Sequence, residues 1–390
     1  MLVEALSRKT SGKAVIREID GLRFFAIMAV LTAHSWGTFV PYSGLTYDLE
    51  KFTTIDAVLM RVFLQGKLGV FLFFTISGFV LALPWARHAL SGGPSLPIGR
   101  FYLKRLTRLE PPYVLCMVGY YIALSAVGRL SYSGDFDNLI ASLLYSHNIV
   151  YGTGSTIYLA AWSLEVEFQF YVLAPLIFTG LFALGQGARR VTMLACILIW
   201  SWAPQTLHGW EWPDTILTYA HYFIAGVLLA DVYVSGQLFF GGKSRWFDFL
   251  ALASFVLILF VFGQIDRNPA AQLGYVAGYA GLFVASFRSL GFRRFVTWVP
   301  VVIIGGMCYS IYLLHGRVMT FVTVYLVNGV KLSGSYAVDQ LIMIVLLVPL
   351  CLAVSAVFFV LIERPTMDSR WPERLRNWFM ARARSVGARL

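Results

Sequence analysis

Two polar side chains in the apolar stretch Asp20–Trp36, Arg23 and His34, are the first candidates for chemistry. Eleven residues separate them, and at about 100° per residue a helix returns to nearly the same face, about 16 Å further along its axis. An imidazole titrates near neutral pH and can act as a base, whereas a guanidinium can hold an anion. We therefore predict one functional polar stripe. Two alternatives stay open: Arg23 snorkels and pairs with Asp20, and His34 is a hydrogen-bonded core residue.

The second candidate is a basic cluster within residues 99–113. Arg105 and Arg108 lie three residues apart, so on a helix their side chains share one face. Pro111 and Pro112 fit the first turn of a following span, where a missing N–H costs little. Two interpretations of the cluster stay open: a topology signal beside lipid headgroups, or a site for an anionic cytoplasmic ligand.

Six further polar residues interrupt or border apolar segments, and we predict that they contact a substrate or support the site. Each could be a helix end or a packing contact, but together they are too many for packing alone. The adjacent Ser77 and Gly78 also predict a close helix contact, because both are small. The six residues are Ser77, Glu167, Gln169, Tyr309, His315 and Glu363.

The elements that must carry these side chains are membrane helices. Of the 390 residues, 58% are hydrophobic and 13% are charged, against about a quarter charged in an ordinary soluble domain. A helix needs about 20 apolar residues to cross the hydrocarbon layer. The predicted fold class is all-α, a polytopic membrane bundle of about ten transmembrane helices, and residues 139–150 form an interfacial or re-entrant piece. The expected spans are 19–39, 68–86, 111–128, 165–184, 190–204, 215–235, 246–263, 270–287, 299–326 and 338–362.

Charge supports an even number of spans with both termini in the cytoplasm. Lysine and arginine are concentrated in alternate loops, as positive-inside topology requires, and the net charge of +11 then faces anionic lipid headgroups rather than nucleic acid. We expect no removable signal peptide and no metal site, since the four cysteines lie singly in different spans. The predicted organisation is a cytoplasmic segment at 1–17, a transmembrane domain at 18–366 and a basic cytoplasmic tail at 367–390.

Six blocks in this order resemble the integral-membrane acyltransferase family three. They are Arg23-x10-His34, Arg105-x-x-Arg108, "FFTISGF", "WSLEVEFQFY", "YSIYLLH" and "IERP", and they extend from about residue 17 to 368. Members are O-acyltransferases that modify bacterial surface polysaccharides, lipopolysaccharide and related acceptors. Phe71 and Phe168 depart from residues common in the family. The extra extracytoplasmic domain of some members is not expected here, which leaves open whether a partner protein completes the reaction.

The resemblance implies transfer of an acyl group, with acetyl expected, from cytoplasmic acetyl-CoA or another acyl-CoA to a hydroxyl of a carbohydrate or glycolipid, in a bacterial inner membrane. On this hypothesis His34 and Arg23 are the catalytic residues, with His34 as the base, and Arg23, Arg105 and Arg108 hold the phosphates of the donor. An acyl-histidine intermediate on His34 is a rival route. The competing function is a transporter or flippase for an anionic or sugar-containing substrate, because buried charges also form transport pathways.

Overall fold

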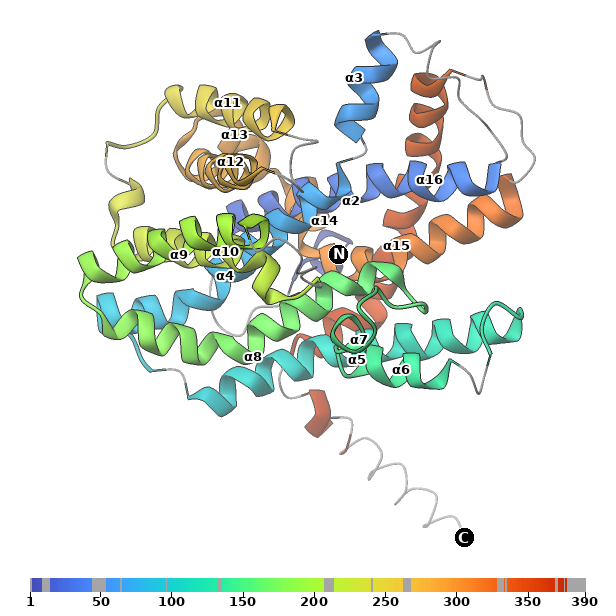
Figure 1. The fold of residues 1–390 in the computed structure, drawn as a ribbon, viewed down its shortest axis with the longest axis horizontal. Helices are drawn as coiled ribbons and strands as arrows, with labels where there is room; N and C mark the ends of the chain where they lie inside the picture. The colour runs from blue at the N-terminus through green and yellow to red at the C-terminus, as the bar shows by residue number, and fades with distance from the viewer. Residues whose placement is uncertain are drawn as a thin grey trace.

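The structure is a computed structural model, and within its described residues every regular element is a helix (Figure 1). This result confirms the all-α class. The described residues are 2–8, 15–43, 54–63, 65–95, 97–131, 135–206, 214–239, 241–261, 268–327, 333, 335–368, 371–374 and 376. Most of the expected tail at 367–390 lies outside them.

Five described helices are long and apolar enough to cross a membrane, and a bent helix pair is a sixth candidate. Helices also cover the other four expected spans. The six candidates are α4 (Gly66–Ser91), α8 (Trp162–Ala183), α10 (Ile216–Val234), α12 (Pro269–Arg288), α16 (Tyr336–Phe358) and the pair α14 (Val299–Gly306) with α15 (Cys308–Val322). The other four are α2 (Arg17–Ser43), α5 (Ile98–Ala126), α9 (Gln186–Thr206) and α11 (Trp246–Phe260).

Short elements connect or extend these helices. Within 139–150, residues 139–143 and 147–150 fall in two helices that are too short to span a membrane, and the expected interfacial or re-entrant position of this segment stays a prediction. The π-helical turn Phe359–Glu363 continues α16 into α17, and a second π-helical turn, Thr323–Val327, extends α15. The remaining short helices are α1 (Leu2–Ala5), α3 (Thr54–Phe63), α6 (Phe136–Leu143), α7 (His147–Tyr151), α13 (Gly291–Val296) and α17 (Arg364–Thr366), with 3₁₀ turns at Leu159–Ala161 and Gln237–Phe239.

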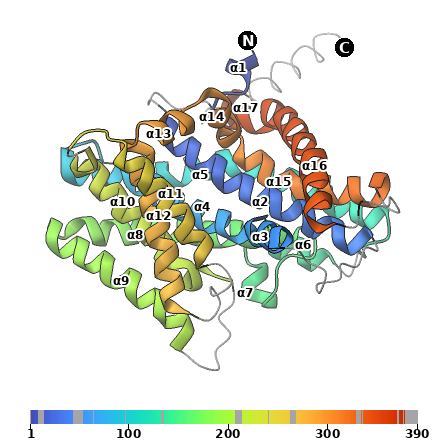
Figure 2. The ribbon, with the colours of Figure 1, turned by 90° about the horizontal axis from the view of Figure 1, so that it is seen from above.

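Helix α4 lies at the centre of the bundle and packs against α2, α8 and α10 (Figure 2). The small residue Gly78 makes this packing possible, because a Cβ there would overlap the backbone of Phe223 on α10. The predicted close contact at Ser77-Gly78 is therefore confirmed. Phe79 and Phe74 fill the surrounding core and are fully buried.

Two expectations about helix boundaries were wrong. The run 299–326 is not one straight span: α14 and α15 meet at Met307 with a bend of 70°. Just before the bend, Gly305 packs so closely on α2 that a Cβ would overlap the carbonyl of Asp20. Pro111 and Pro112 also do not start a helix, since both lie inside the continuous helix α5.

The interior prolines of α5 are tolerated because other segments replace the lost hydrogen bonds. Proline has no N–H, so Pro111 and Pro112 leave the carbonyls of Thr107 and Arg108, four residues earlier, without helical donors. The indole N–H of Trp371 donates to the Thr107 carbonyl (2.7 Å). The hydroxyl of Thr366 donates to the Arg108 carbonyl (3.3 Å). Tertiary contacts thus keep the helix intact where the sequence alone predicted a start.

Candidate active site

A cavity lies between α2, α4, α5, α8 and α15, and four arginines line it. Three of them, Arg23, Arg105 and Arg108, come from two helices and were expected from the sequence. The fourth, Arg8, belongs to the N-terminal segment and was missed as a site residue, because no spacing relates it to the others. We call this space the arginine cavity.

Arg8 and Arg23 meet at one buried carboxylate. Their Nη1 atoms lie 2.7 Å and 2.6 Å from the same oxygen of Asp20. Burial alone would lower the pKa of Arg8, but the Asp20 carboxylate raises it above its usual value, so this side chain stays charged. The pairing of Arg23 with Asp20, an alternative in the sequence, is therefore present, although Arg23 also borders the cavity.

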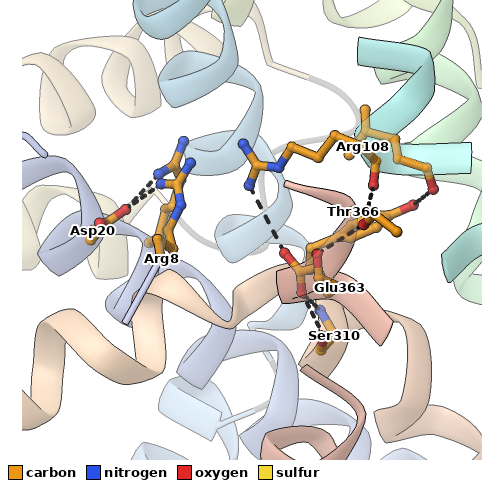
Figure 3. A network of polar contacts seen from close by, with 9 residues as sticks. Arg8, Asp20, Arg108, Ser310, Glu363 and Thr366 are labelled. Atoms are coloured by element: carbon orange, nitrogen blue, oxygen red, sulfur yellow. Dashed lines mark hydrogen bonds and ion pairs between the residues drawn. The ribbon is translucent and has the colours of Figure 1, made fainter. Parts of the chain in front are cut away.

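Arg105 and Arg108 are less fully partnered than this pair. The Arg105 guanidinium lies 6.0 Å from the ring of Phe101 and 5.8 Å from that of Tyr171, in the range of cation–π contact. No ion pair of Arg105 occurs among the described residues. Nη2 of Arg108 lies 3.9 Å from Oε1 of Glu363 (Figure 3). The buried Nε of Arg108 has no hydrogen-bond acceptor among the described residues.

Two carboxylates lie at or near the cavity. Glu167 accepts hydrogen bonds from the hydroxyls of Ser77 and Tyr171, and all three residues line the cavity. Glu363, which is fully buried and pairs with Arg108, accepts from the backbone N–H of Ser310 (3.0 Å) and from its hydroxyl (2.5 Å). Of the six predicted supporting residues, four therefore lie at or near the arginines: Ser77, Glu167, Glu363 and Tyr309.

Tyr309 joins two of the helices at the cavity. Its hydroxyl donates to the carbonyl of Leu109 on α5 (2.8 Å), and both residues line the cavity. Gln169, by contrast, is not brought to the arginines. Its side-chain oxygen accepts from the backbone N–H of Ile216 (2.9 Å) at the start of α10, where a helix needs a partner for its free amides.

Further along α2 than Arg23, His34 forms a pair with His315 of α15. The distance between His34 Nδ1 and His315 Nε2 is 2.7 Å. The other nitrogen of His315, Nδ1, lies 2.7 Å from the carbonyl of Tyr312 and 3.1 Å from that of Ile311. His34 is partly exposed, whereas His315 is fully buried.

This bonding pattern assigns the protons of a neutral histidine pair. Because carbonyls only accept, Nδ1 of His315 carries its proton and Nε2 of His315 is an acceptor. Nδ1 of His34 must then be the donor between the rings, which leaves Nε2 of His34 with a free lone pair. A second residue thus orients His34 with its basic nitrogen available, as a general base requires.

The histidine pair and the arginine cavity are connected through α15. Arg23 of α2 and Tyr312 of α15 line the same cavity. His34 of α2 contacts His315 of α15. Both polar residues of α2 therefore lie toward α15. Tyr312 belongs to both sites: its hydroxyl contacts Ser163 (2.5 Å) in the cavity wall, and its carbonyl holds His315. Among the described residues no group of three or more potential metal ligands occurs.

Comparisons with known proteins point to one family. A model described as an acyltransferase domain matches residues 16–361. "O-acetyltransferase OatA" of Staphylococcus aureus is 24% identical over 338 residues, which cover 80% of this chain and 52% of the relative. "Putative peptidoglycan O-acetyltransferase YrhL" of Bacillus subtilis is 23% identical and is covered to 50%.

A third relative is matched over most of its length. "Putative membrane-bound transacylase BcsY" of Komagataeibacter xylinus is 26% identical over 402 residues, covering 93% of this chain and 86% of the relative. The chain spans about half the length of the Staphylococcus and Bacillus relatives. No solved structure matches.

Proposed function

Because the chain belongs to the acyltransferase 3 family, we propose that it is a membrane O-acyltransferase with a cytoplasmic acyl-CoA donor. The group transferred is acetyl, and the acceptor is a hydroxyl of a carbohydrate or glycolipid. Two relatives, one named an O-acetyltransferase and one named a putative peptidoglycan O-acetyltransferase, support the class of reaction. The second name also supports a carbohydrate acceptor, and the donor rests on the chemistry of the site.

The arginine cavity is the observation that carries the donor proposal. Four guanidinium groups line one cavity, and Arg105 faces it without a described ion pair. Guanidinium forks match the oxygens of phosphate, and such charge-assisted bonds are among the strong hydrogen bonds of proteins. Coenzyme A carries several phosphates, so the cavity suits the charged end of an acyl-CoA.

His34 is the proposed general base. Its free Nε2 takes the proton of the acceptor hydroxyl while the oxygen attacks the thioester carbonyl. The C–S bond then breaks, the sulfur leaves as thiolate, and the protonated His34 returns the proton to it. The products are an ester and coenzyme A. His315 acts through His34, because it fixes the orientation of the ring.

The spacing along α2 supports this division of roles. Arg23 and His34 are separated by about 16 Å along the helix axis. An extended pantetheine arm spans a distance of this scale, so phosphates at the arginines leave the thioester within reach of the histidine. Ser77, Glu167 and Tyr309 are proposed to support the donor end, and Glu363 to pair with Arg108 and partly neutralise it.

For the membrane arrangement we propose ten spans, both termini in the cytoplasm and a bacterial inner membrane. The contact between chain ends supports an even number of spans, because the Arg364 guanidinium donates to the Glu4 carbonyl (3.0 Å). Helices α1 and α17 accordingly lie at the same end of the molecule (Figure 2). The transmembrane domain is residues 18–366, flanked by cytoplasmic segments 1–17 and 367–390.

The test is acyl-CoA thioester turnover by purified protein in nanodiscs. We expect transfer or slow hydrolysis in the wild type, and a loss of about 10²–10⁴-fold in His34→Ala. Arg105→Ala should mainly raise the donor KM. The exposed His88 offers a matched control, since His88→Ala removes an imidazole remote from the cavity and should retain activity.

The opposite results have a clear meaning. Folded wild-type protein that neither turns over acyl-CoA nor binds coenzyme A would contradict the proposal and favour a transporter or flippase. Acyl label trapped on the protein without acceptor, and absent in His34→Ala, would replace general-base catalysis by the acyl-histidine route.

A further inference from the structure

The C-terminal end of the described chain contacts two of the three segments that bring arginines to the cavity, α5 and the N-terminal segment. Pro111 and Pro112 leave two carbonyls of α5 without helical donors, and one of these carbonyls belongs to Arg108 itself. Trp371 donates to the preceding carbonyl, that of Thr107, at 2.7 Å. The backbone that carries Arg108 is therefore tied to the C-terminal segment just where the helix lacks internal support.

Thr366 makes the second contact with α5. Its hydroxyl lies 3.3 Å from the Arg108 carbonyl and 2.8 Å from the Glu363 carbonyl. One hydroxyl has a single proton, so the two acceptors share it and this contact is weaker than that of Trp371. It nevertheless places Arg108 beside Glu363, as Figure 3 shows.

Arg364 contacts the N-terminal segment, which carries Arg8. Its guanidinium donates to the carbonyls of Ser7 (3.3 Å) and Glu4 (3.0 Å). Arg8 directly follows Ser7 and reaches the cavity, where it pairs with Asp20. The backbone next to Arg8 is thus fixed by the same stretch of chain that fixes Arg108.

We propose that Arg364, Thr366 and Trp371, which we call the C-terminal clamp, are positioning residues for the anion-binding arginines Arg8 and Arg108. None of the three lines the arginine cavity. They act through the backbone by holding the two arginine-bearing segments at the spacing that the donor phosphates need. This inference rests on the proposed function and adds to it a role for a segment outside the site.

The experiment compares Trp371→Phe with the wild type in nanodiscs. Phenylalanine keeps an aromatic ring but removes the N–H that bonds Thr107. We expect the KM for acetyl-CoA and the Kd for coenzyme A to rise together by about three- to tenfold, the scale of one net hydrogen bond, with kcat nearly unchanged. Trp246→Phe is the matched control, because Trp246 is 77% exposed at the start of α11.

A second variant covers the case in which Trp371→Phe does not fold. Thr366→Val removes the shared proton while keeping the side-chain volume, and we expect a smaller rise in the donor KM of about twofold. Thr297→Val is its control, since that hydroxyl also donates to a backbone carbonyl, that of Arg293 (2.8 Å), away from the cavity.

The outcomes separate the two proposals. Wild-type protein that binds no coenzyme A overturns the donor site and the clamp together. Wild-type protein that binds coenzyme A, with unchanged KM and Kd in the folded variants, overturns the clamp alone. A lower melting temperature with unchanged KM and Kd assigns these residues a structural role only, and also overturns the clamp.

Discussion

Two groups of arginines in this molecule differ in how their guanidinium groups are partnered. Between α9 and α10, Arg189 and Arg190 share the carboxylate of Asp231 at 2.5 to 2.6 Å. Arg190 also donates to Gln237 (2.6 Å), and Arg189 to the carbonyl of Leu184 (2.9 Å). We call this group the bracing cluster.

The arginine cavity contains the same kind of pair, since Arg8 and Arg23 share the carboxylate of Asp20, and two further arginines that are less fully partnered. Arg105 has cation–π contacts with Phe101 and Tyr171 and no ion pair in the described chain, and Arg108 meets its carboxylate at 3.9 Å. In the bracing cluster a single buried carboxylate forms close ion pairs with both arginines. The difference teaches that unpaired donors facing open space, rather than a number of arginines, distinguish a binding site from a structural brace.

The largest expected effect breaks the bracing cluster. Asp231→Ala leaves two arginines, one of them buried, without their carboxylate, and removing one partner of a buried ion pair costs about 3–5 kcal/mol of unfolding free energy. Denaturant unfolding in detergent measures this loss. The donor KM of the folded fraction should equal that of the wild type, and a raised KM would contradict the contrast between the two clusters.

Arg105→Gln tests the arginine cavity, and it should change the donor KM rather than the stability, the reverse of Asp231→Ala. Losing a charge-assisted contact to phosphate should raise the donor KM by about 10- to 100-fold, whereas stability should change little because no described carboxylate loses its partner. The matched variant is Arg190→Gln, which should lower the melting temperature and leave the donor KM unchanged. If both variants raised the donor KM to a similar extent, the distinction between the arginine cavity as a binding site and the bracing cluster as a structural group would be wrong.

Arg8→Gln sharpens the comparison by testing the arginine that no sequence pattern indicated. Its Nε is buried without a described acceptor, but Asp20 already occupies another of its nitrogens. We therefore expect a smaller rise in the donor KM, of about three- to tenfold. Steady-state kinetics with varied acetyl-CoA measures it, and an unchanged KM would restrict the donor site to the three arginines of α2 and α5.

The smallest effect is expected for Glu363→Gln. Glutamine can still accept from Ser310, but it no longer competes with an anionic ligand for Arg108. Because this ion pair is long, we expect the donor KM to fall by only about two- to fivefold. Titration of the protein with coenzyme A gives the corresponding Kd. A rise in KM would mean that Glu363 mainly orients Arg108 rather than neutralising it.

Several features of the fold could be predicted because they depend on local sequence. In the described residues helices lie within each of the ten expected ranges, and five of them, with a bent pair as a sixth candidate, are long and apolar enough to cross a membrane, since long apolar runs have few alternatives in a bilayer. The positions of Arg23 and His34 on a common side follow from helix geometry alone. The boundaries at Pro111 and Met307 could not be predicted, because distant segments supply the contacts that extend or break these helices.

The site residues divide in the same way. Ser77 and Glu167 were recognisable as polar groups in apolar surroundings, and the structure places them in contact. Gln169 had the same appearance, yet it binds the first amide of α10. Polarity inside a membrane helix predicts that a side chain needs a partner, but it does not say whether that partner is a substrate or another helix.

By itself, the sequence determined an all-helical membrane protein, its apolar helices and the polar stripe on α2, because hydrophobic length and helical period are local properties. Only the tertiary structure decided which donors remain unpaired. Arg8 enters the cavity, His315 orients His34, and Asp231 neutralises Arg189 and Arg190 because these groups meet across segments remote in the chain. A binding site depends on what is left without a partner after folding, and that balance exists only in three dimensions.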